Sequence, residues 1–498
     1  MKKIFVTIPL ISLFLFASCE IVSSNSNSNE NRTGKENISI YAINDFHGAI
    51  NYSPDDDEPG LARVATYLKD KKSADPDHTI VLSSGDMWQG TFESYHNKGK
   101  VITEAMNNIG FDSMTIGNHE FDWGAEDIVY NEQFANFPIL GANIMEYPNT
   151  SVKSSIGESY VVLEKGKMKI GIIGVIGQDQ MTSINSRYMT DLYFADPTPI
   201  VKELSTKLRK EEKVDIVVLS IHAGQGSVDS SLAAKGKYVD AIFCAHTHYA
   251  EKQLVNGVPY IQGGSKGKHV SEINLSFDYD KNKVEFLSYT NWSTATLKKQ
   301  IPDSEVEAII DSYGSLSSVA GNAVVGTATS NLTSNNYLPN VSNYVAAKHA
   351  KKEGYNINLV MTNIARETIS FGEIKYRDMF RGLPFDNRIY IAKAKGRDIK
   401  YQAEYSYVYR ENETLKVNSY SDNEYYLIAV IDYLLFHQNT NKEYNYFSNF
   451  NPDTDIVGYL KNDAGEPYYP RDMVADHIMS LNNKTINPSN YSGERYRA

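Results

Sequence analysis

Cysteine is scarce in this chain of 498 residues, which contains only Cys19 and Cys244. Two thiols cannot supply the several crosslinks of a disulfide-stabilised scaffold. The fold must therefore rest on a hydrophobic core, and a chain of this length is expected to build two domains, or three, each with its own core.

Positive charge is also scarce, because 49 Lys and Arg residues are outnumbered by 61 Asp and Glu residues, leaving a formal net charge of −12. Nucleic-acid polymers and anionic lipid surfaces attract basic protein surfaces, so this balance argues against a general binder of either. A small anion bound by this protein must instead meet metal ions or single arginines.

The N-terminal apolar run, Ile4–Ala17, is shorter than the roughly 20 residues that cross a bilayer. It follows a lysine pair and has the length of a signal-peptide core, so we expect a signal peptide at residues 1–18. The small residues before Cys19 resemble a bacterial lipobox, which predicts lipidation of Cys19. An ordinary secretory signal or an uncleaved anchor is the alternative. We expect an exported cell-envelope lipoprotein, on the periplasmic face or the cell surface, with the lipid as its only membrane contact.

Composition divides the rest of the chain. Residues 19–37 carry almost no apolar side chains, which predicts a disordered tether. Residues 38–301 alternate Val- and Ile-rich runs with helix-like segments, the pattern of a layered α/β domain. We expect a linker helix within residues 302–321 and a separate domain over residues 322–498. A monomer is expected.

Polar side chains recur where the predicted strands end. Those strands are Ser39–Ile43, Thr79–Ser83, Met114–Ile116, Ile216–Ser220 and Ala241–Cys244. The polar residues that follow them are Asp45, His47, Asp86, Asn118, His222, His246 and His248. Ligands converge beyond the carboxyl ends of strands in an open α/β sheet. Each fragment alone is as easily a solvated turn or, for His222, a core histidine. Their order predicts a two-metal phosphoesterase site, with Asp86 bridging ions about 3.5–4 Å apart.

The motifs that carry these residues resemble those of a known family. They are Ile43-Asn44-Asp45-Phe46-His47-Gly48, Ser83-Ser84-Gly85-Asp86, Gly117-Asn118-His119-Glu120-Phe121-Asp122, Ser220-Ile221-His222-Ala223-Gly224 and Ala245-His246-Thr247-His248. The sequence is similar to the calcineurin-like metallophosphoesterases and, more narrowly, to the bacterial 5′-nucleotidase/2′,3′-cyclic phosphodiesterase family. The resemblance implies a four-layer αββα sandwich, followed by a linker helix and a smaller α+β substrate-binding domain.

The resemblance also assigns roles. It implies one metal held by Asp45, His47 and His248, a second held by Asn118, His222 and His246, and Asp86 shared between them. His119 and Asp122 match the family's catalytic dyad. The cofactors would be two divalent ions of Zn, Mn, Co or Fe, all of which accept such ligands. The implied reaction is attack on phosphorus by metal-bound hydroxide, without a covalent enzyme intermediate.

The C-terminal resemblance points to substrate residues. Asn363 and Arg366 stand where the family has its arginine motif, although the glycines between them are missing. Tyr444 is the candidate to stack on a nucleobase, and Tyr407, in the tyrosine-rich stretch Tyr405–Tyr409, is the candidate for the opposing ring. Either tyrosine of that stretch is also a plausible plain strand residue.

Three functions compete on this basis. The first is an exported phosphohydrolase that releases phosphate from nucleotides. The second keeps the chemistry but acts on cyclic nucleotides, sugar nucleotides or other phosphate esters. The third, of another class, is a surface lipoprotein that binds without catalysis. Because no predicted metal ligand is missing, the sequence favours an enzyme.

Overall fold

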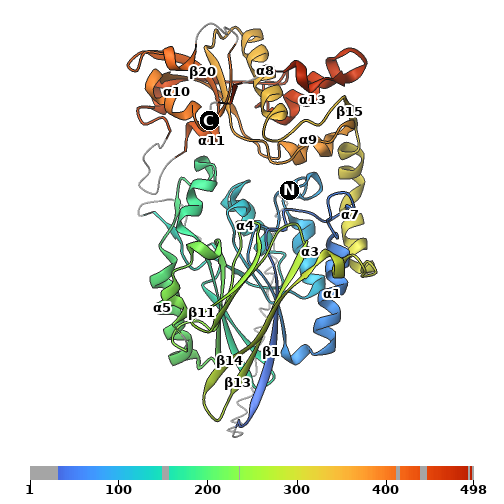
Figure 1. Ribbon diagram of the computed structural model, residues 1–498, viewed down its shortest axis with the longest axis vertical. Coiled ribbons are helices and arrows are strands. Elements are labelled where there is room, and N and C mark those ends of the chain that lie inside the picture. The colour runs from blue at the N-terminus through green and yellow to red at the C-terminus, as the bar shows by residue number, and fades with distance from the viewer. Residues whose placement is uncertain are drawn as a thin grey trace, which may run out of the picture.

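The computed structural model describes residues 32–147, 156–234, 236–410, 416–437, 446–491 and 494–495. Figure 1 shows a larger domain that contains the N-terminal part of the chain and a smaller domain built by the C-terminal part. The predicted signal peptide and Cys19 lie outside the described residues. Within the described part of the chain, no helix combines the length and the apolar character needed to cross a membrane.

Two six-stranded sheets form the centre of the larger domain. The first has the order β14-β13-β1-β2-β3-β4, and the second has the order β11-β12-β10-β9-β7-β6. Strands of the first sheet are β1 (Lys35–Ile43), β2 (Thr79–Ser83), β3 (Ser113–Thr115), β4 (Ile139–Leu140), β13 (His269–Asp278) and β14 (Lys283–Ser293). Strands of the second are β6 (Tyr160–Lys165), β7 (Met168–Ile176), β9 (Ile216–His222), β10 (Ala241–Phe243), β11 (Ala250–Val255) and β12 (Val258–Gly263).

Helices cover the outer faces of both sheets. The first sheet packs against α1 (Leu61–Ala74), α3 (Lys100–Ile109) and α4 (Ala125–Glu132) through a shared apolar cluster that includes Leu68 and Met106. The second packs against α5 (Pro197–Lys207), whose Val201 belongs to the same apolar cluster as Val217 and Leu219. A third cluster, with Ile40 and Ile172, fills the space between the sheets. The four layers αββα predicted from the sequence are confirmed.

Short elements complete the larger domain. They are α2 (Phe92–Tyr95), α6 (Thr294–Leu297), the pair β5 (Ile144–Glu146) and β8 (Leu192–Phe194), and single turns of helix that include Gln178–Ser183 and Ser186–Tyr188. The last three residues of the predicted tether, Lys35–Asn37, belong to strand β1, where they pair with Ser276–Asp278 of β13. Arg32 is also anchored, by two hydrogen bonds of 2.7 and 3.1 Å to Asp215.

Helix α7 (Ser304–Gly321) runs from the larger to the smaller domain along one side of the molecule (Figure 1). It lies within residues 302–321, where the sequence predicts a linker helix, and it contains Gly314. A glycine inside a helix costs about 1 kcal/mol, and the contacts of Val306, Ile309 and Ile310 with the core of the larger domain offset such a cost.

The smaller domain is an α+β fold around a six-stranded sheet of order β21-β18-β20-β16-β19-β23. These strands are β16 (Leu359–Thr362), β18 (Ile389–Lys395), β19 (Tyr407–Tyr409), β20 (Tyr425–Ile431), β21 (Ile456–Tyr459) and β23 (Glu494–Arg495). A three-stranded sheet holds β15 (Val324–Ala328), β17 (Gly372–Lys375) and β22 (Thr485–Ile486). The helices are α8 (Tyr337–Lys352), α9 (Tyr376–Gly382), α10 (Gly396–Ala403), α11 (Asp432–Leu435), α12 (Pro452–Asp455) and α13 (Pro470–Ser480).

Candidate metal centre

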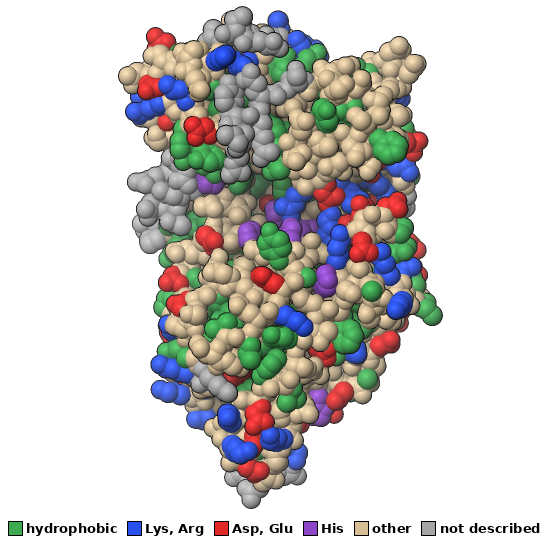
Figure 2. All heavy atoms as spheres, viewed as in Figure 1, with side chains coloured by type: hydrophobic (Ala, Val, Ile, Leu, Met, Phe, Trp, Pro, Cys, Tyr) green, Lys and Arg blue, Asp and Glu red, His purple; other side chains and the backbone are tan. Residues whose placement is uncertain are grey.

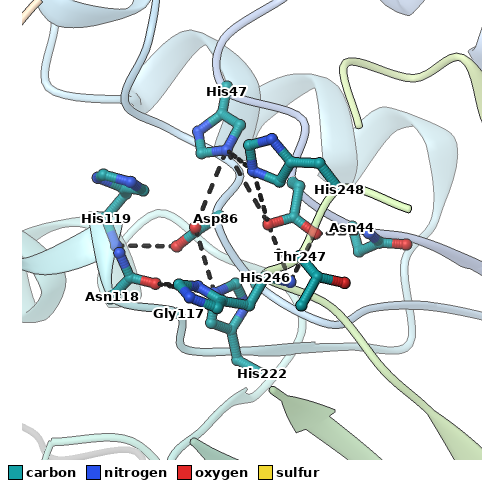
Figure 3. Close-up of polar contacts among 12 residues, drawn as sticks. Asn44, His47, Asp86, Gly117, Asn118, His119, His222, His246, Thr247 and His248 are labelled. Carbon is teal, nitrogen blue, oxygen red and sulfur yellow. Dashed lines mark hydrogen bonds and ion pairs between the residues drawn. The ribbon is translucent and has the colours of Figure 1, made fainter. Parts of the chain in front are cut away.

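The predicted metal ligands stand on sharp turns at the ends of the central strands. Five of them have positive φ angles: Asp45 47°, His47 49°, Asp86 56°, His246 77° and His248 62°. Residues with a Cβ seldom adopt this left-handed conformation, and it persists only where the surrounding structure holds it. Figure 3 shows the result, with the side chains turned toward one shared space.

One group of ligands surrounds the first candidate position. His248 Nε2 lies 3.0 Å from His47 Nε2 and 3.4 Å from the Oδ1 atom of Asp45. His47 Nε2 also lies 3.9 Å from Asp86 Oδ2. The ligand atoms of Asp45, His47 and His248 all fall within 4.8 Å of one another, close enough to hold one cation.

The second group adjoins the first through Asp86. The same Asp86 Oδ2 atom lies 3.2 Å from His222 Nε2. The Asn118 side-chain oxygen lies 3.0 Å from His222 Nε2 and 2.9 Å from His246 Nδ1. Asp86 therefore reaches both groups, as expected of a bridging carboxylate.

Two imidazoles are oriented by backbone carbonyls. His47 Nδ1 lies 3.0 Å from the carbonyl oxygen of Gln89, and His222 Nδ1 lies 2.8 Å from that of Ser84. Donation from Nδ1 leaves Nε2 as the atom with a free lone pair, facing the carboxylates. Metal-binding histidines are held in this way by the hydrogen bond of their other ring nitrogen.

Glycine is required where the two ligand turns meet. A Cβ atom at Gly117 would lie 2.3 Å from Asp86 Oδ1, and one at Gly85, whose φ is 95°, would lie 2.7 Å from the Gly117 nitrogen. The close approach of these turns brings Asp86 beside Asn118. The converging lone pairs and the mixed Asp, His and Asn donor set fit two neighbouring divalent cations.

His119 and Asp122 form a pair beside this centre. His119 Nδ1 lies 2.7 Å from Asp122 Oδ2, and the backbone N–H of His119 donates to Asp86 Oδ1 at 2.8 Å. Burial opposes protonation of the ring, but the carboxylates of Asp122 and Asp86 outweigh it and raise the pKa of His119. Phe385 of the smaller domain stacks on the imidazole, with ring centroids 5.7 Å apart and planes inclined by 14°.

Glu120 is a buried residue that sequence reasoning passed over. Its carboxylate accepts backbone N–H groups of Asp86, Met87 and Gly117, each at 2.8 Å, and that of Trp88 at 3.3 Å. Burial first, and then the nearby Asp86 carboxylate, raise the pKa of Glu120 to about 7. The sequence could have indicated a role for Glu120, because it belongs to the Gly-Asn-His-Glu motif two residues after the predicted ligand Asn118.

A cavity of about 390 Å³ lies between the two domains, next to this centre. Its wall includes His119 and Asp122 of the larger domain, and Asn363, Arg366, Phe385 and Tyr433 of the smaller domain. Arg366 Nη2 lies 3.1 Å from His47 Nε2, across 319 positions of sequence. Figure 2 shows histidine, Lys and Arg side chains gathered where the domains meet. The predicted substrate residues Asn363 and Arg366 are thus brought beside the predicted metal ligands.

The predicted tyrosines are placed differently. Tyr407 is buried in β19, where its hydroxyl donates to the carbonyl of Asn335, and it is not among the residues that line the cavity. A side chain fixed in the sheet in this way cannot face a nucleobase there. Tyr444 lies outside the described residues.

A larger hollow, of about 650 Å³, lies beside the turn between β13 and β14. Two of its arginines are paired, Arg32 with Asp215 and Arg209 with Asp240, each at 2.7 Å. None of the predicted metal ligands lines this hollow, so the cavity between the domains is the candidate active site.

Comparison with known proteins agrees with this geometry. Residues 38–250 match the family model of calcineurin-like phosphoesterases. Fold and site together define a metal-dependent phosphoester hydrolase with two divalent ions.

The comparisons also cover the smaller domain. The chain is 26% identical over 415 residues to the protein UshA of Yersinia enterocolitica, covering 73% of this chain and 75% of that protein. It is 32% identical over 314 residues to an apyrase of Tabanus yao, covering 56% and 55%. The structure of a 5′-nucleotidase precursor from Thermus thermophilus superposes with a TM-score of 0.73 at 19% identity, covering 90% of this chain and 99% of that one. In sequence and in fold the chain is thus similar to the 5′-nucleotidases, and its larger domain matches the calcineurin-like phosphoesterases.

Four predictions are thereby confirmed: the family, the fold class, the hydrolase class and the pair of divalent ions. The roles of the individual site residues stay predictions, as do the domain boundaries.

Proposed function

We propose that this protein is an exported hydrolase that releases phosphate from nucleoside phosphates. The observation that carries the proposal is the cavity between the domains, which joins the two-metal centre and its His119–Asp122 pair to Arg366 and to the aromatic rings of Phe385 and Tyr433. A volume of about 390 Å³ suits a small molecule and not a polymer. The names of the relatives, among them an apyrase and a 5′-nucleotidase precursor, support the same substrate class.

The residues divide the work of hydrolysis. Divalent ions held by Asp45, His47 and His248 and by Asn118, His222 and His246, with Asp86 between them, would supply Lewis acidity toward the phosphoryl oxygens and would lower the pKa of water toward neutral pH. His119, held by Asp122, donates hydrogen bonds or a proton where negative charge develops on the phosphoryl group and the leaving oxygen. Arg366 offers a planar cation for the phosphoryl oxygens.

The substrate range is tested with the chain loaded with Mn, Zn or Co. Rates are compared for AMP, 2′,3′-cyclic AMP, UDP-glucose and p-nitrophenyl phosphate. AMP should be hydrolysed with the highest kcat/KM of the four. The substitution Asp86→Ala should abolish phosphate release. Faster hydrolysis of the cyclic or sugar nucleotide would change the substrate. Unchanged activity in Asp86→Ala would reject the site.

We further propose that the chain is anchored to the cell envelope through lipidated Cys19, on the strength of the lipobox-like sequence before it. The full-length chain and its Cys19→Ala variant are expressed with radioactive palmitate. The wild type should incorporate label and partition into detergent, and the variant should do neither. An unlabelled wild type would leave an ordinary secretory signal or an uncleaved anchor.

A further inference from the structure

The part of the cavity wall beyond the His119–Asp122 pair is built by both domains. From the larger domain, the segment 182–188, which follows β7, contributes Ser183, Asn185, Arg187 and Tyr188. From the smaller domain come Asp386 and Tyr433. A substrate whose phosphoryl group lies at the metal centre must therefore place its leaving group against residues of both domains.

Arg187 is held in one orientation by partners across the domain boundary. Its Nη1 donates to Asp432 Oδ2 at 2.7 Å, and its Nη2 donates to the carbonyl of Asp386 at 2.9 Å and to the Tyr188 hydroxyl at 2.5 Å. The Asp432 side chain is 1% exposed, whereas that of Arg187 remains 22% exposed. A buried carboxylate thus fixes a guanidinium that still reaches the cavity.

Neighbouring contacts hold the same segment against α11. The Tyr433 hydroxyl donates to the carbonyl of Thr182 at 3.1 Å, and the hydroxyl of Ser186 donates to the carbonyl of Phe436 at 2.6 Å. The guanidinium is also connected to the reaction centre through the smaller domain, because it binds the carbonyl of Asp386 and the ring of the preceding residue, Phe385, stacks on His119.

We propose that Arg187 is a specificity-determining residue that recognises the nucleoside leaving group, so that the larger domain takes part in substrate selection. The centroid of the Tyr188 ring lies 4.5 Å from the Arg187 Cζ atom, and Nη2 is occupied by Asp386 and Tyr188. The other flat face of the guanidinium and its remaining N–H donors are what it offers to a nucleobase ring or to ribose oxygens. A nucleoside is longer than a phenol, so it extends farther from the metal centre into the cavity that Arg187 lines. This inference rests on the proposed nucleotide function.

The test compares AMP with p-nitrophenyl phosphate in metal-loaded wild type, Arg187→Ala and Arg187→Lys. Arg187→Ala should lower kcat/KM for AMP by about 10–100-fold, because it removes hydrogen bonds from a charged group to the substrate. It should change kcat/KM for p-nitrophenyl phosphate by less than about 3-fold. Arg187→Lys keeps the positive charge beside Asp432 but loses the planar guanidinium. It should lower kcat/KM for AMP more than for p-nitrophenyl phosphate, but less than Arg187→Ala does.

Arg377→Ala is the matched control, because Arg377 makes a comparable ion pair across the domains, 3.1 Å from Glu93, but does not line the cavity. It should not change the ratio of the two substrates. Equal losses for both substrates in Arg187→Ala would show that Arg187 only holds the domains together, and no loss would show that it is dispensable. Either result overturns the proposal. If Arg187→Ala does not fold, an unchanged substrate ratio in Arg187→Lys overturns it.

The wild-type rates separate this inference from the function on which it rests. A wild type that hydrolyses p-nitrophenyl phosphate but not AMP refutes the nucleotide function itself. A wild type active on AMP, with an unchanged substrate ratio in both Arg187 variants, refutes only the role of Arg187.

Discussion

The carboxylate of Glu120 accepts the backbone N–H of Asp86 at 2.8 Å, and the same Oε2 atom accepts the N–H of Gly117, also at 2.8 Å. One side chain thereby joins the turn that carries Asp86, the predicted bridging ligand, to the turn that carries Asn118. We infer that this connection sets the spacing between the two predicted groups of metal ligands.

Glu120→Gln should therefore weaken metal binding, because an amide NH₂ would face backbone N–H groups that need an acceptor. Residues that orient metal ligands typically contribute about 10–100-fold in metal affinity. We expect a rightward shift of that order in the Mn²⁺ titration of activity, with activity recovered at saturating metal. Glu126→Gln, at an exposed position in the first turn of α4, is the control. An unchanged titration would refute the role of Glu120.

Gly117→Ala should disrupt the centre by a steric route. The added Cβ would lie 2.3 Å from Asp86 Oδ1 and 2.8 Å from His222 Cε1, so the ligands must move apart. A displacement of about 1 Å can cost roughly 10²-fold in rate. Phosphate release and metal content by mass spectrometry should both fall. Gly226→Ala is the matched control, since a Cβ atom at Gly226 would have no neighbour within 4 Å. Full activity in Gly117→Ala would mean that the turns are not as closely packed as described.

Asp122→Asn should separate catalysis from metal binding. Asp122 belongs to none of the groups of described side chains close enough to hold a metal ion, so metal content should be preserved. The variant loses the carboxylate that orients His119 and favours its protonated form, and positioned acid catalysis is worth about 10²–10⁴-fold. We expect kcat to fall within that range at saturating metal. A normal kcat would remove the dyad from the mechanism, and a loss of metal would make Asp122 part of the centre.

His78 should make stability depend on pH far from the active site. Its ring nitrogens lie 2.8 Å from Glu36 and 2.8 Å from Asp75, and the hydrogen bond to Glu36, although opposed by burial, raises the pKa of His78 above 6.5. A raised pKa in the folded state means that the ion pairs stabilise the fold fully below pH 6.5 and cease to do so as pH rises through the raised value.

His78→Gln should accordingly lower the free energy of unfolding at pH 5.5 by roughly 0.2–1 kcal/mol, as expected of a partly exposed ion pair, and leave it unchanged at pH 9. Urea unfolding followed by tryptophan fluorescence at both pH values measures the difference. A deficit that is equal at both pH values would assign the effect to packing and not to charge.

Local pattern predicted much of the catalytic domain. Strand β2 occupies Thr79–Ser83 as predicted, because a short buried apolar run bounded by turn residues has few other solutions. His222 differs in detail, since it is the last residue of β9 and does not follow the strand. Its side chain nevertheless reaches Asp86, because the carboxyl end of a strand and the turn after it open onto the same crevice.

The residues of the substrate cavity were harder to predict from the sequence than the metal ligands. Tyr407 was a candidate for stacking because an aromatic residue in a tyrosine-rich stretch fits either a strand or a binding ring, and in the structure it is a buried strand residue. Arg187 and Asp432 carry no motif, and their contact spans 245 positions of sequence. Only the docking of the two domains makes them neighbours.

The amino-acid sequence by itself determined the kinds of ligand, their order along the chain and the α/β layers that present them, because strand ends and glycine turns are properties of neighbouring residues. Tertiary structure alone decided that Glu120 joins two ligand turns, that Phe385 covers His119 and that both domains enclose the cavity. These contacts arise from the packing of distant surfaces, whose burial and charge balance exist only once the chain has folded.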